Sequence, residues 1–360
     1  MSVQVSYKKQ TLFGIIMILL ILISIEVVLR TNDFVVLQNQ NCDDISRPAF
    51  SNYDANIEKE ICMDSKKISW HYSPISAFSP NQNLQTININ SDGLRGSEIN
   101  EKLENTYRII LIGGSTAFGA GSSSDETTIS GFLQKKFDET YDEFNIEVIN
   151  GGILGSDSRT ETFNTKNKFL KFKPDLLIVY GGWNDGAHLW SPIGFDFFPV
   201  SQYNVIDTIY FPFFRTGLFF YYHYKDMITT EQDIPKLVNS WEERWQEICE
   251  QGKSEGFDVI VTVQPVLGTG DKFLTSNEHM IWEDKKTRLI ELHMVLDGMV
   301  KKLPNMKSSC TDVADLRMSF DDISEDLFFD GGHTNDLGNE IISQKIYEKI
   351  LPTILEDISK

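Results

Sequence analysis

The chain begins with one long apolar stretch and changes, after residue 105, to short apolar runs that alternate with amphipathic segments. Apolar runs predict four strands and a weaker fifth, at residues 108–113, 147–150, 175–180, 258–263 and 311–316. Apolar positions at helical spacing predict helices around residues 129–137, 238–252, 280–300 and 337–354. Apolar strands that alternate with helices predict an α/β fold, in which a central, mostly parallel five-stranded sheet is covered on both faces.

The N-terminal apolar stretch runs from residue 11 to 29, and its only charged side chain is Glu26. A helix of about twenty residues is about 30 Å long, which is enough to cross the hydrocarbon core of a bilayer. No small-x-small cleavage site follows, so an uncleaved transmembrane signal anchor is favoured over a cleaved signal peptide or a buried core helix. Lys8 and Lys9 precede the stretch and predict a cytoplasmic N-terminus, with the rest of the chain outside the cell membrane.

These patterns divide the chain into three parts. Residues 1–30 are interpreted as the cytoplasmic N-terminus and anchor, 31–105 as a polar stalk and extension, and 106–360 as the main domain. The segment 191–224 is rich in aromatic residues and too long for an ordinary connection between a strand and a helix. It either caps a binding cleft, touches the membrane surface, or packs on the main core as a helical excursion.

Charge and cysteine content narrow the possible functions. The 52 acidic side chains outnumber the 33 lysines and arginines, giving a net charge of −19, which disfavours nucleic acids and anionic lipid surfaces as partners. The four cysteines allow three disulfide connectivities, and buried free thiols are the alternative. Neither a structural metal nor a cofactor is expected, because no metal-ligand cluster, Walker loop or dinucleotide fingerprint is present.

Polar, glycine-rich segments follow the predicted strands. They are residues 113–116 (GGST), 150–155 (NGGILG), 182–185 (GWND) and 330–333 (DGGH). Ligands in open α/β sheets bind beyond the carboxyl ends of the strands, so these segments are expected to form one site. Three-residue spacing on a tight turn allows the Asp330 carboxylate to orient the imidazole of His333, which can then take a proton from the hydroxyl of Ser115.

Each feature alone is a weak signal, but together they resemble the four sequence blocks of the SGNH (GDSL) hydrolase family. The stretch at residues 90–96 (NSDGLRG) is also similar to membrane-anchored members of that family. The resemblance covers residues 88–350 and implies a three-layer α/β/α sandwich with a flavodoxin-like sheet. It departs from the family at one position, since Gly114 stands where the first block usually has aspartate.

Carried over residue by residue, the resemblance implies that Ser115 is the nucleophile, His333 the general base and Asp330 the residue that orients His333. The oxyanion hole would consist of the backbone N–H groups of Ser115 and Gly155, chosen over Gly152, and the side-chain amide of Asn184. Three further residues after the third strand are expected to line the substrate cleft: Trp183, His188 and Trp190.

The sequence thus favours a membrane-anchored serine esterase that hydrolyses a small acyl ester or an acylated carbohydrate through an acyl-enzyme. Two alternatives remain open at this point. The same site could transfer the acyl group to a sugar hydroxyl as an O-acyltransferase, or the domain could be a non-catalytic binding module at the cell surface.

Overall fold

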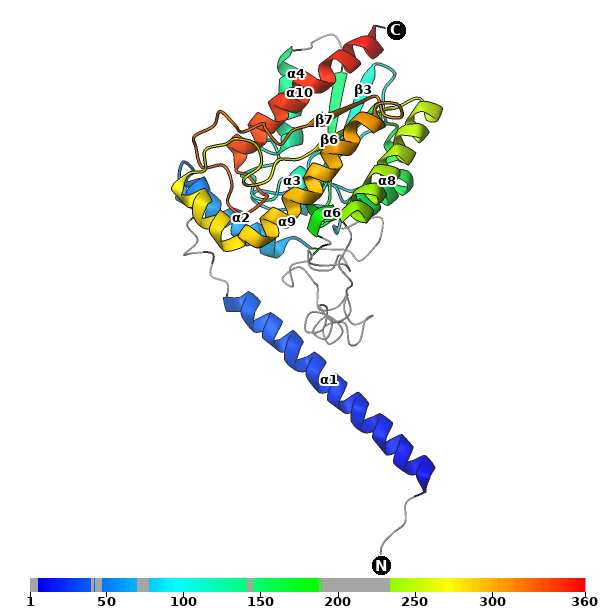
Figure 1. Cartoon of the computed structure of the whole chain (residues 1–360), viewed down its shortest axis with the longest axis vertical. Helices are drawn as coiled ribbons and strands as arrows, with labels where there is room; N and C mark the ends of the chain where they lie inside the picture. Colours follow the sequence, from blue (N-terminus) through cyan, green and yellow to red (C-terminus); the bar gives the residue numbers. More distant parts are fainter. Residues whose placement is uncertain are drawn as a thin grey trace, which may run out of the picture. The chain divides into compact units, whose positions relative to one another are not determined.

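The computed structural model describes residues 6–39, 42, 47–69, 78–140, 145–187, 189 and 234–359 (Figure 1). Two compact units make up the chain: the helix α1 (Tyr7–Asn39) belongs to the first, and the described residues from Cys42 onward belong to the second. His188, Trp190 and the predicted insertion at residues 191–224 lie outside the described residues.

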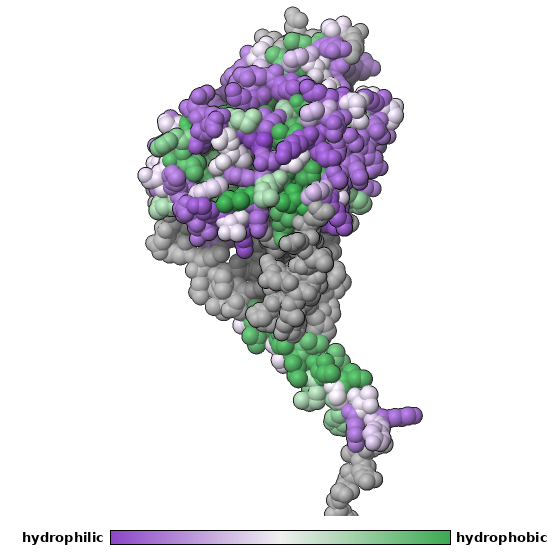
Figure 2. All heavy atoms as spheres, viewed as in Figure 1, coloured by the Kyte–Doolittle hydropathy of each residue, from purple (hydrophilic) through white to green (hydrophobic). Residues whose placement is uncertain are grey.

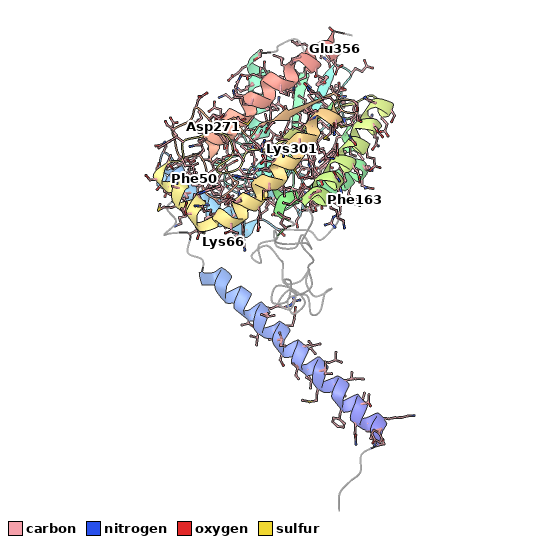
Figure 3. All side chains as sticks on the ribbon, in the orientation of Figure 1. Phe50, Lys66, Phe163, Asp271, Lys301 and Glu356 are labelled. Atoms are coloured by element: carbon pink, nitrogen blue, oxygen red, sulfur yellow. A yellow bond between two sulfur atoms is a disulfide. The ribbon has the colours of Figure 1, made fainter. Side chains whose placement is uncertain are left out.

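Helix α1 is apolar on all sides. The candidate span Tyr7–Thr31 is 25 residues long and contains an 18-residue window with a mean hydropathy of 3.0, and the side chains radiate outward around the helix (Figures 2 and 3). At 1.5 Å per residue this length gives about 38 Å, so the helix is long and apolar enough to cross a membrane. The N-terminal apolar helix is therefore confirmed, and it continues past residue 30 to Asn39. The domain boundaries at residues 30 and 105 stay predictions.

The second unit is built on a five-stranded, wholly parallel sheet of strand order β4-β3-β5-β6-β7. The strands are β3 (Thr106–Gly113), β4 (Asn145–Gly152), β5 (Leu176–Gly181), β6 (Asp258–Val263) and β7 (Asp312–Asp315). This is the flavodoxin-like order, in which the direction of chain progression reverses between β3 and β5. The predicted fold class is confirmed, including the weak fifth strand.

Both faces of the sheet are buried, which explains the continuous apolar runs. On one face, β3 presents Ile109 and Leu111 to α4 (Ile129–Thr140) and α10 (Asp336–Ile358), whose labels lie together in Figure 1. On the other, Ile110 and Ile112 pack in a cluster that includes side chains of α8 (Ile234–Glu255) and α9 (Ser276–Met306). Alternate side chains of a strand point to opposite faces, so the layers form an α/β/α sandwich.

Two helical segments between β4 and β5 were not predicted. Helix α5 (Ser158–Asn167) contacts α8, and the short helix η2 (Phe169–Phe172) follows it. The sequence of α5 has no apolar stripe at helical spacing. Its buried positions are instead polar: Ser158, Glu161, Thr162, Asn164 and Thr165.

The segment ahead of the sheet contains regular structure. It includes the short helix η1 (Pro48–Phe50), helix α2 (Ala55–Lys67) and an antiparallel pair formed by β1 (Gln82–Asn83) and β2 (Asn88–Ile89). A disulfide joins Cys42 to Cys62 in α2, and a second joins Cys249 in α8 to Cys310. Of the three connectivities that the sequence allowed, the structure therefore contains the one with Cys42–Cys62 and Cys249–Cys310.

Candidate active site

Ser115 is the first residue of α3 (Ser115–Phe118), a helix of a single turn that begins directly after β3. The approach to this turn is close, because a Cβ atom at Gly113 would lie 2.2 Å from the carbonyl oxygen of Tyr180. The helix ends at Gly119, whose φ of +87° is in the left-handed region that favours glycine. The backbone N–H groups at the start of a helix have no acceptor within it, so that of Ser115 is available to a ligand.

His333 and Asp330 lie on the tight turn just before α10. Asp330 Oδ1 accepts hydrogen bonds from the backbone N–H groups of Gly332 and His333, both at 2.8 Å. Asp330 Oδ2 lies 2.8 Å from His333 Nδ1. Burial disfavours the charged form of Asp330, yet the pKa of its carboxyl lies well below the usual range, because His333 and the two N–H groups stabilise the carboxylate.

The other ring nitrogen of His333 reaches the serine. His333 Nε2 lies 2.6 Å from Ser115 Oγ, although the two residues are 218 positions apart in the sequence. With Nδ1–H donating to Asp330, Nε2 is the nitrogen that accepts the proton of the Ser115 hydroxyl. A hydroxyl, an imidazole and a carboxylate in this order can move a proton from serine to histidine.

Asn184 lies in α6 (Trp183–Ala187), directly after β5, and is buried. Its Nδ2 donates to the carbonyl oxygen of Ser156 at 2.6 Å, which fixes the amide beside the turn that follows β4. A Cβ atom at Gly114 would lie only 2.3 Å from that Nδ2. The glycine that departs from the SGNH pattern is therefore the residue over which the Asn184 amide packs.

Two glycines near the end of β4 are candidates for the second backbone donor: Gly152, the last residue of the strand, and Gly155, in the turn that follows. The N–H of Gly152 donates to Asn150 Oδ1 at 3.0 Å, and a Cβ there would lie 2.1 Å from the backbone nitrogen of Phe118. Gly155 lies beyond the strand with a φ of +74°. The N–H of Gly152 is thus engaged by Asn150, and the choice of Gly155 as a donor to the oxyanion stays a prediction.

Trp183 is half-buried and packs on the histidine turn. Cβ atoms added at Gly331 and Gly332 would lie 2.9 and 2.7 Å from its ring, so the indole leaves no room for side chains on that turn. Of the three residues expected to line the substrate cleft, Trp183 lies next to the histidine turn; the other two are outside the described residues.

Several residues of the site were not expected from the sequence. Phe329 stacks on the imidazole of His333, with ring centroids 5.6 Å apart and planes at 13°, and the Arg47 guanidinium lies 4.7 Å from the Phe329 centroid. Neither residue belongs to a polar, glycine-rich segment. Phe329 directly precedes the segment at residues 330–333, which is the one signal that could have identified it.

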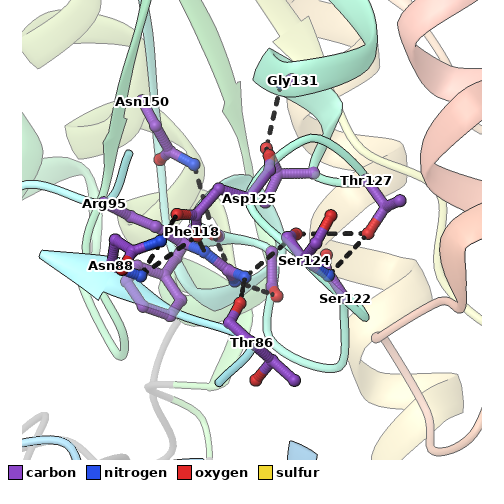
Figure 4. Close-up of polar contacts among 12 residues, drawn as sticks. Thr86, Asn88, Arg95, Phe118, Ser122, Ser124, Asp125, Thr127, Gly131 and Asn150 are labelled. Carbon is purple, nitrogen blue, oxygen red and sulfur yellow. Dashed lines mark hydrogen bonds and ion pairs between the residues drawn. The ribbon is translucent and has the colours of Figure 1, made fainter. Parts of the chain in front are cut away.

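Arg95, in the stretch at residues 90–96, holds the far end of α3 (Figure 4). Its side chain is 1% exposed, and Nη1 donates to the carbonyl oxygens of Phe118 and Gly119 at 3.3 and 2.7 Å. Nη2 donates to the carbonyl oxygens of Thr86 and Ser124, and Nε pairs with Asp125 at 2.7 Å. The resemblance pointed to residues 90–96 without giving them a role. The contacts show that Arg95 fixes the carboxyl end of α3, the helix that begins with Ser115.

The chain is similar in fold to several solved esterase structures. An acetyl xylan esterase, AlAXEase, matches with a TM-score of 0.42 and 15% identity, over 68% of this chain and 99% of the other. A lipase/acylhydrolase from Enterococcus faecalis matches with 0.42 and 18%, over 68% and 95%. Axe2, an acetylxylan esterase from Geobacillus stearothermophilus, matches with 0.42 and 13%, over 69% and 96%. No protein-family model and no curated protein matches the chain.

Proposed function

We propose that the protein is a membrane-anchored serine esterase with Ser115 as nucleophile, His333 as general base and Asp330 as the residue that orients the base. The observation that supports this most directly is the continuous chain of contacts from Ser115 Oγ to His333 Nε2 and from Nδ1 to Asp330, at 2.6 and 2.8 Å. A serine hydroxyl is a weak nucleophile unless an adjacent base removes its proton, and this contact provides the base.

The reaction follows from these contacts. Ser115 Oγ attacks the ester carbonyl carbon while its proton moves to His333 Nε2, and the carbonyl oxygen becomes an oxyanion. The N–H groups of Ser115 and Gly155 and the amide of Asn184 stabilise this oxyanion. The alcohol leaves with the proton from His333, and the acyl group stays on Ser115. Water then attacks the acyl-enzyme, His333 again takes and returns a proton, and the acid is released.

For the substrate we propose a neutral small acyl ester or an acylated carbohydrate. The net charge of −19 disfavours strongly anionic substrates, because they would be repelled on approach. Helix α1 would hold the enzyme in the cell membrane, with the N-terminus in the cytoplasm and the catalytic unit outside. The two disulfides support the outer location, because disulfides persist in oxidising compartments and are rare in the cytosol.

The test uses the full-length chain in detergent with p-nitrophenyl acetate. We expect Ser115→Ala and His333→Ala to lower kcat/KM by at least about 10³-fold. The matched controls Ser254→Ala in α8 and His279→Ala in α9, both at exposed positions, should keep the wild-type rate. A wild-type rate in Ser115→Ala would reject the mechanism. Adding an oligosaccharide acceptor to the assay, and measuring acylated sugar against free acid, separates hydrolysis from acyl transfer.

Topology is tested separately in intact cells. Added protease should digest the catalytic unit if it lies outside, whereas protection from the protease until the cells are lysed would contradict the proposed orientation.

A further inference from the structure

Ser156 connects three of the turns that form the site. It is buried and directly follows Gly155. Its carbonyl oxygen accepts the hydrogen bond from Asn184 Nδ2 at 2.6 Å, and its hydroxyl lies 3.0 Å from the carbonyl oxygen of Gly113, two residues before the serine nucleophile. A displacement of Ser156 would therefore move the proposed oxyanion donors relative to Ser115.

A second contact of the Ser156 hydroxyl is a carboxyl group. Glu161 Oε1 lies 3.2 Å from Ser156 Oγ, and the residue is 4% exposed. Glu161 lies in the first turn of α5, where its backbone N–H donates to the carbonyl oxygen of Asp157 at 2.8 Å. The carboxyl lies against β5, because a Cβ at Gly181 would be 3.6 Å from Glu161 Oε2.

Counting protons identifies the state of this carboxyl. The carbonyl oxygen of Gly113 only accepts hydrogen bonds, and the hydroxyl of Ser156 has a single proton to donate. If that proton goes to Gly113, the contact with Glu161 is a hydrogen bond only when Glu161 carries a proton and donates it to Ser156 Oγ. Both contacts are therefore satisfied at once only by the neutral carboxylic acid.

The surroundings of Glu161 favour the same state. Burial raises the pKa of its carboxyl well above the usual range, and the neighbouring carboxylates of Asp185 and Asp157 raise it further, which outweighs the lowering effect of the contact with Ser156. The cations nearby contact the aspartates: Arg244 lies 3.9 Å from Asp185 and Arg159 lies 3.5 Å from Asp157. Arg244 also donates to the hydroxyl of Ser158, which in turn donates to Asp185.

We propose that Glu161 is a positioning residue of the esterase: as a neutral acid it donates to Ser156 and thereby fixes the turn that presents Gly155 to the oxyanion and holds the amide of Asn184. This inference rests on the proposed function. It adds a dependence on pH, because loss of the Glu161 proton leaves the Ser156 hydroxyl donating to the carboxylate instead of to Gly113. Loss of the same proton also places a negative charge close to the groups that stabilise the negative oxyanion.

The first test compares two substitutions at neutral pH. Glu161→Gln keeps a donor for Ser156 in a neutral side chain of the same length, whereas Glu161→Ala removes the donor. We expect Glu161→Ala to lower kcat by about 10- to 100-fold with little change in KM, because the affected interactions act on the transition state. Glu161→Gln should have a kcat at least about tenfold above that of Glu161→Ala. Equal kcat values for the two variants would overturn the proposal.

The second test is the pH profile of kcat for the full-length enzyme. The wild type should lose kcat as Glu161 ionises at alkaline pH, and Glu161→Gln should lack this loss. The matched control Glu340→Gln, at an exposed position of α10, should follow the wild type. Infrared spectra add a measurement independent of activity: the carbonyl band of a buried protonated carboxyl should be present in the wild type at neutral pH and absent in Glu161→Gln.

The results of these tests can reject the role of Glu161 without rejecting the proposed esterase function. Superimposable profiles of wild type and Glu161→Gln, with Ser115→Ala inactive, would reject the role of Glu161 and leave the esterase intact. An active Ser115→Ala would reject the esterase mechanism and the inference with it.

Discussion

Substituting Gly114 by alanine should remove most of the activity while leaving the fold in place. The added Cβ would lie 2.3 Å from Asn184 Nδ2, whereas ordinary contacts of a Cβ atom begin at 3.4 Å. One of the two groups must therefore move by about 1 Å. Gly114 lies between β3 and α3, where the backbone is fixed at both ends, so we expect the Asn184 side chain to move.

The magnitude follows from the proposed role of Asn184. Loss of one oxyanion-hole donor costs about 10²- to 10³-fold in kcat, or about 2.7–4 kcal/mol in transition-state stabilisation. Gly114→Ala should approach this loss, with KM for p-nitrophenyl acetate changed by less than about threefold, because the interaction is made in the transition state.

A double-mutant cycle shows whether the effect passes through Asn184. If it does, Gly114→Ala should cost little further activity in the Asn184→Ala background, since the displaced amide is already absent. Gly14→Ala, where nothing lies within 4 Å of the added Cβ, is the matched control. Fully additive losses in the cycle, or a wild-type kcat for Gly114→Ala, would refute the reasoning.

Substitutions at three further places are predicted to change stability or activity. Arg95→Ala leaves the Asp125 carboxylate without its buried partner and should lower the free energy of unfolding by about 3–5 kcal/mol, measured by urea denaturation. A loss below about 1 kcal/mol would contradict the role of Arg95 in fixing the end of α3. Replacing Cys249 and Cys310 by alanine opens a link between positions 61 apart and should cost about 4 kcal/mol in the same assay. Asp330→Asn should lower kcat by about 10⁴-fold. Because the pKa of Asp330 is depressed, its contribution to stability is present above pH about 4 and lost as the pH falls below it. Wild type and Asp330→Asn should therefore differ in unfolding free energy at pH 7, and this difference should shrink steadily as the pH falls below about 4.

The central strands β3, β5 and β6 could be predicted from the sequence because they are buried on both faces. Ile109 to Ile112 read as a continuous apolar run whichever way each side chain points, and the same holds for β5 and β6. The clustering of polar segments at strand ends followed from the parallel arrangement alone. The contact of Ser115 with His333 was expected because both residues belong to segments at strand ends that resemble SGNH blocks; no local pattern could give it, since the two residues are 218 positions apart.

The contacts of Glu161 and Gly114 could not be predicted from the sequence, for a different physical reason. Glu161 is buried in a helix whose inner face is polar, so its sequence has the composition of an exposed segment. The pKa of its carboxyl is raised by burial and by Asp185 and Asp157, which only the folded chain brings close to it. The packing at Gly114, where the SGNH pattern usually has aspartate, was also not predictable, because the Asn184 amide that occupies the space of a side chain there comes from another strand end.

Residues in the segment 31–105, interpreted from the sequence as a stalk and extension, contact the elements that hold both Ser115 and His333. On the serine side, Arg95 donates to the carbonyl oxygens at the end of α3 and satisfies groups that a one-turn helix leaves open. On the histidine side, the carbonyl oxygen of Ala49 accepts a hydrogen bond from Asn335, the residue that caps α10 directly after the histidine turn.

The same segment also contacts the imidazole of His333 indirectly, through packing between aromatic rings. Phe50 lies against Phe329, with ring centroids 5.1 Å apart, and Phe329 stacks on His333. The disulfide from Cys42 to Cys62 links the start of this segment to α2. A soluble form that begins at residue 106 would lack every one of these contacts, whereas one that begins before Cys42 would keep them. The form that begins before Cys42 should therefore be active. The form that begins at residue 106 should be inactive, because its reacting groups are no longer held in place, although its sheet is complete.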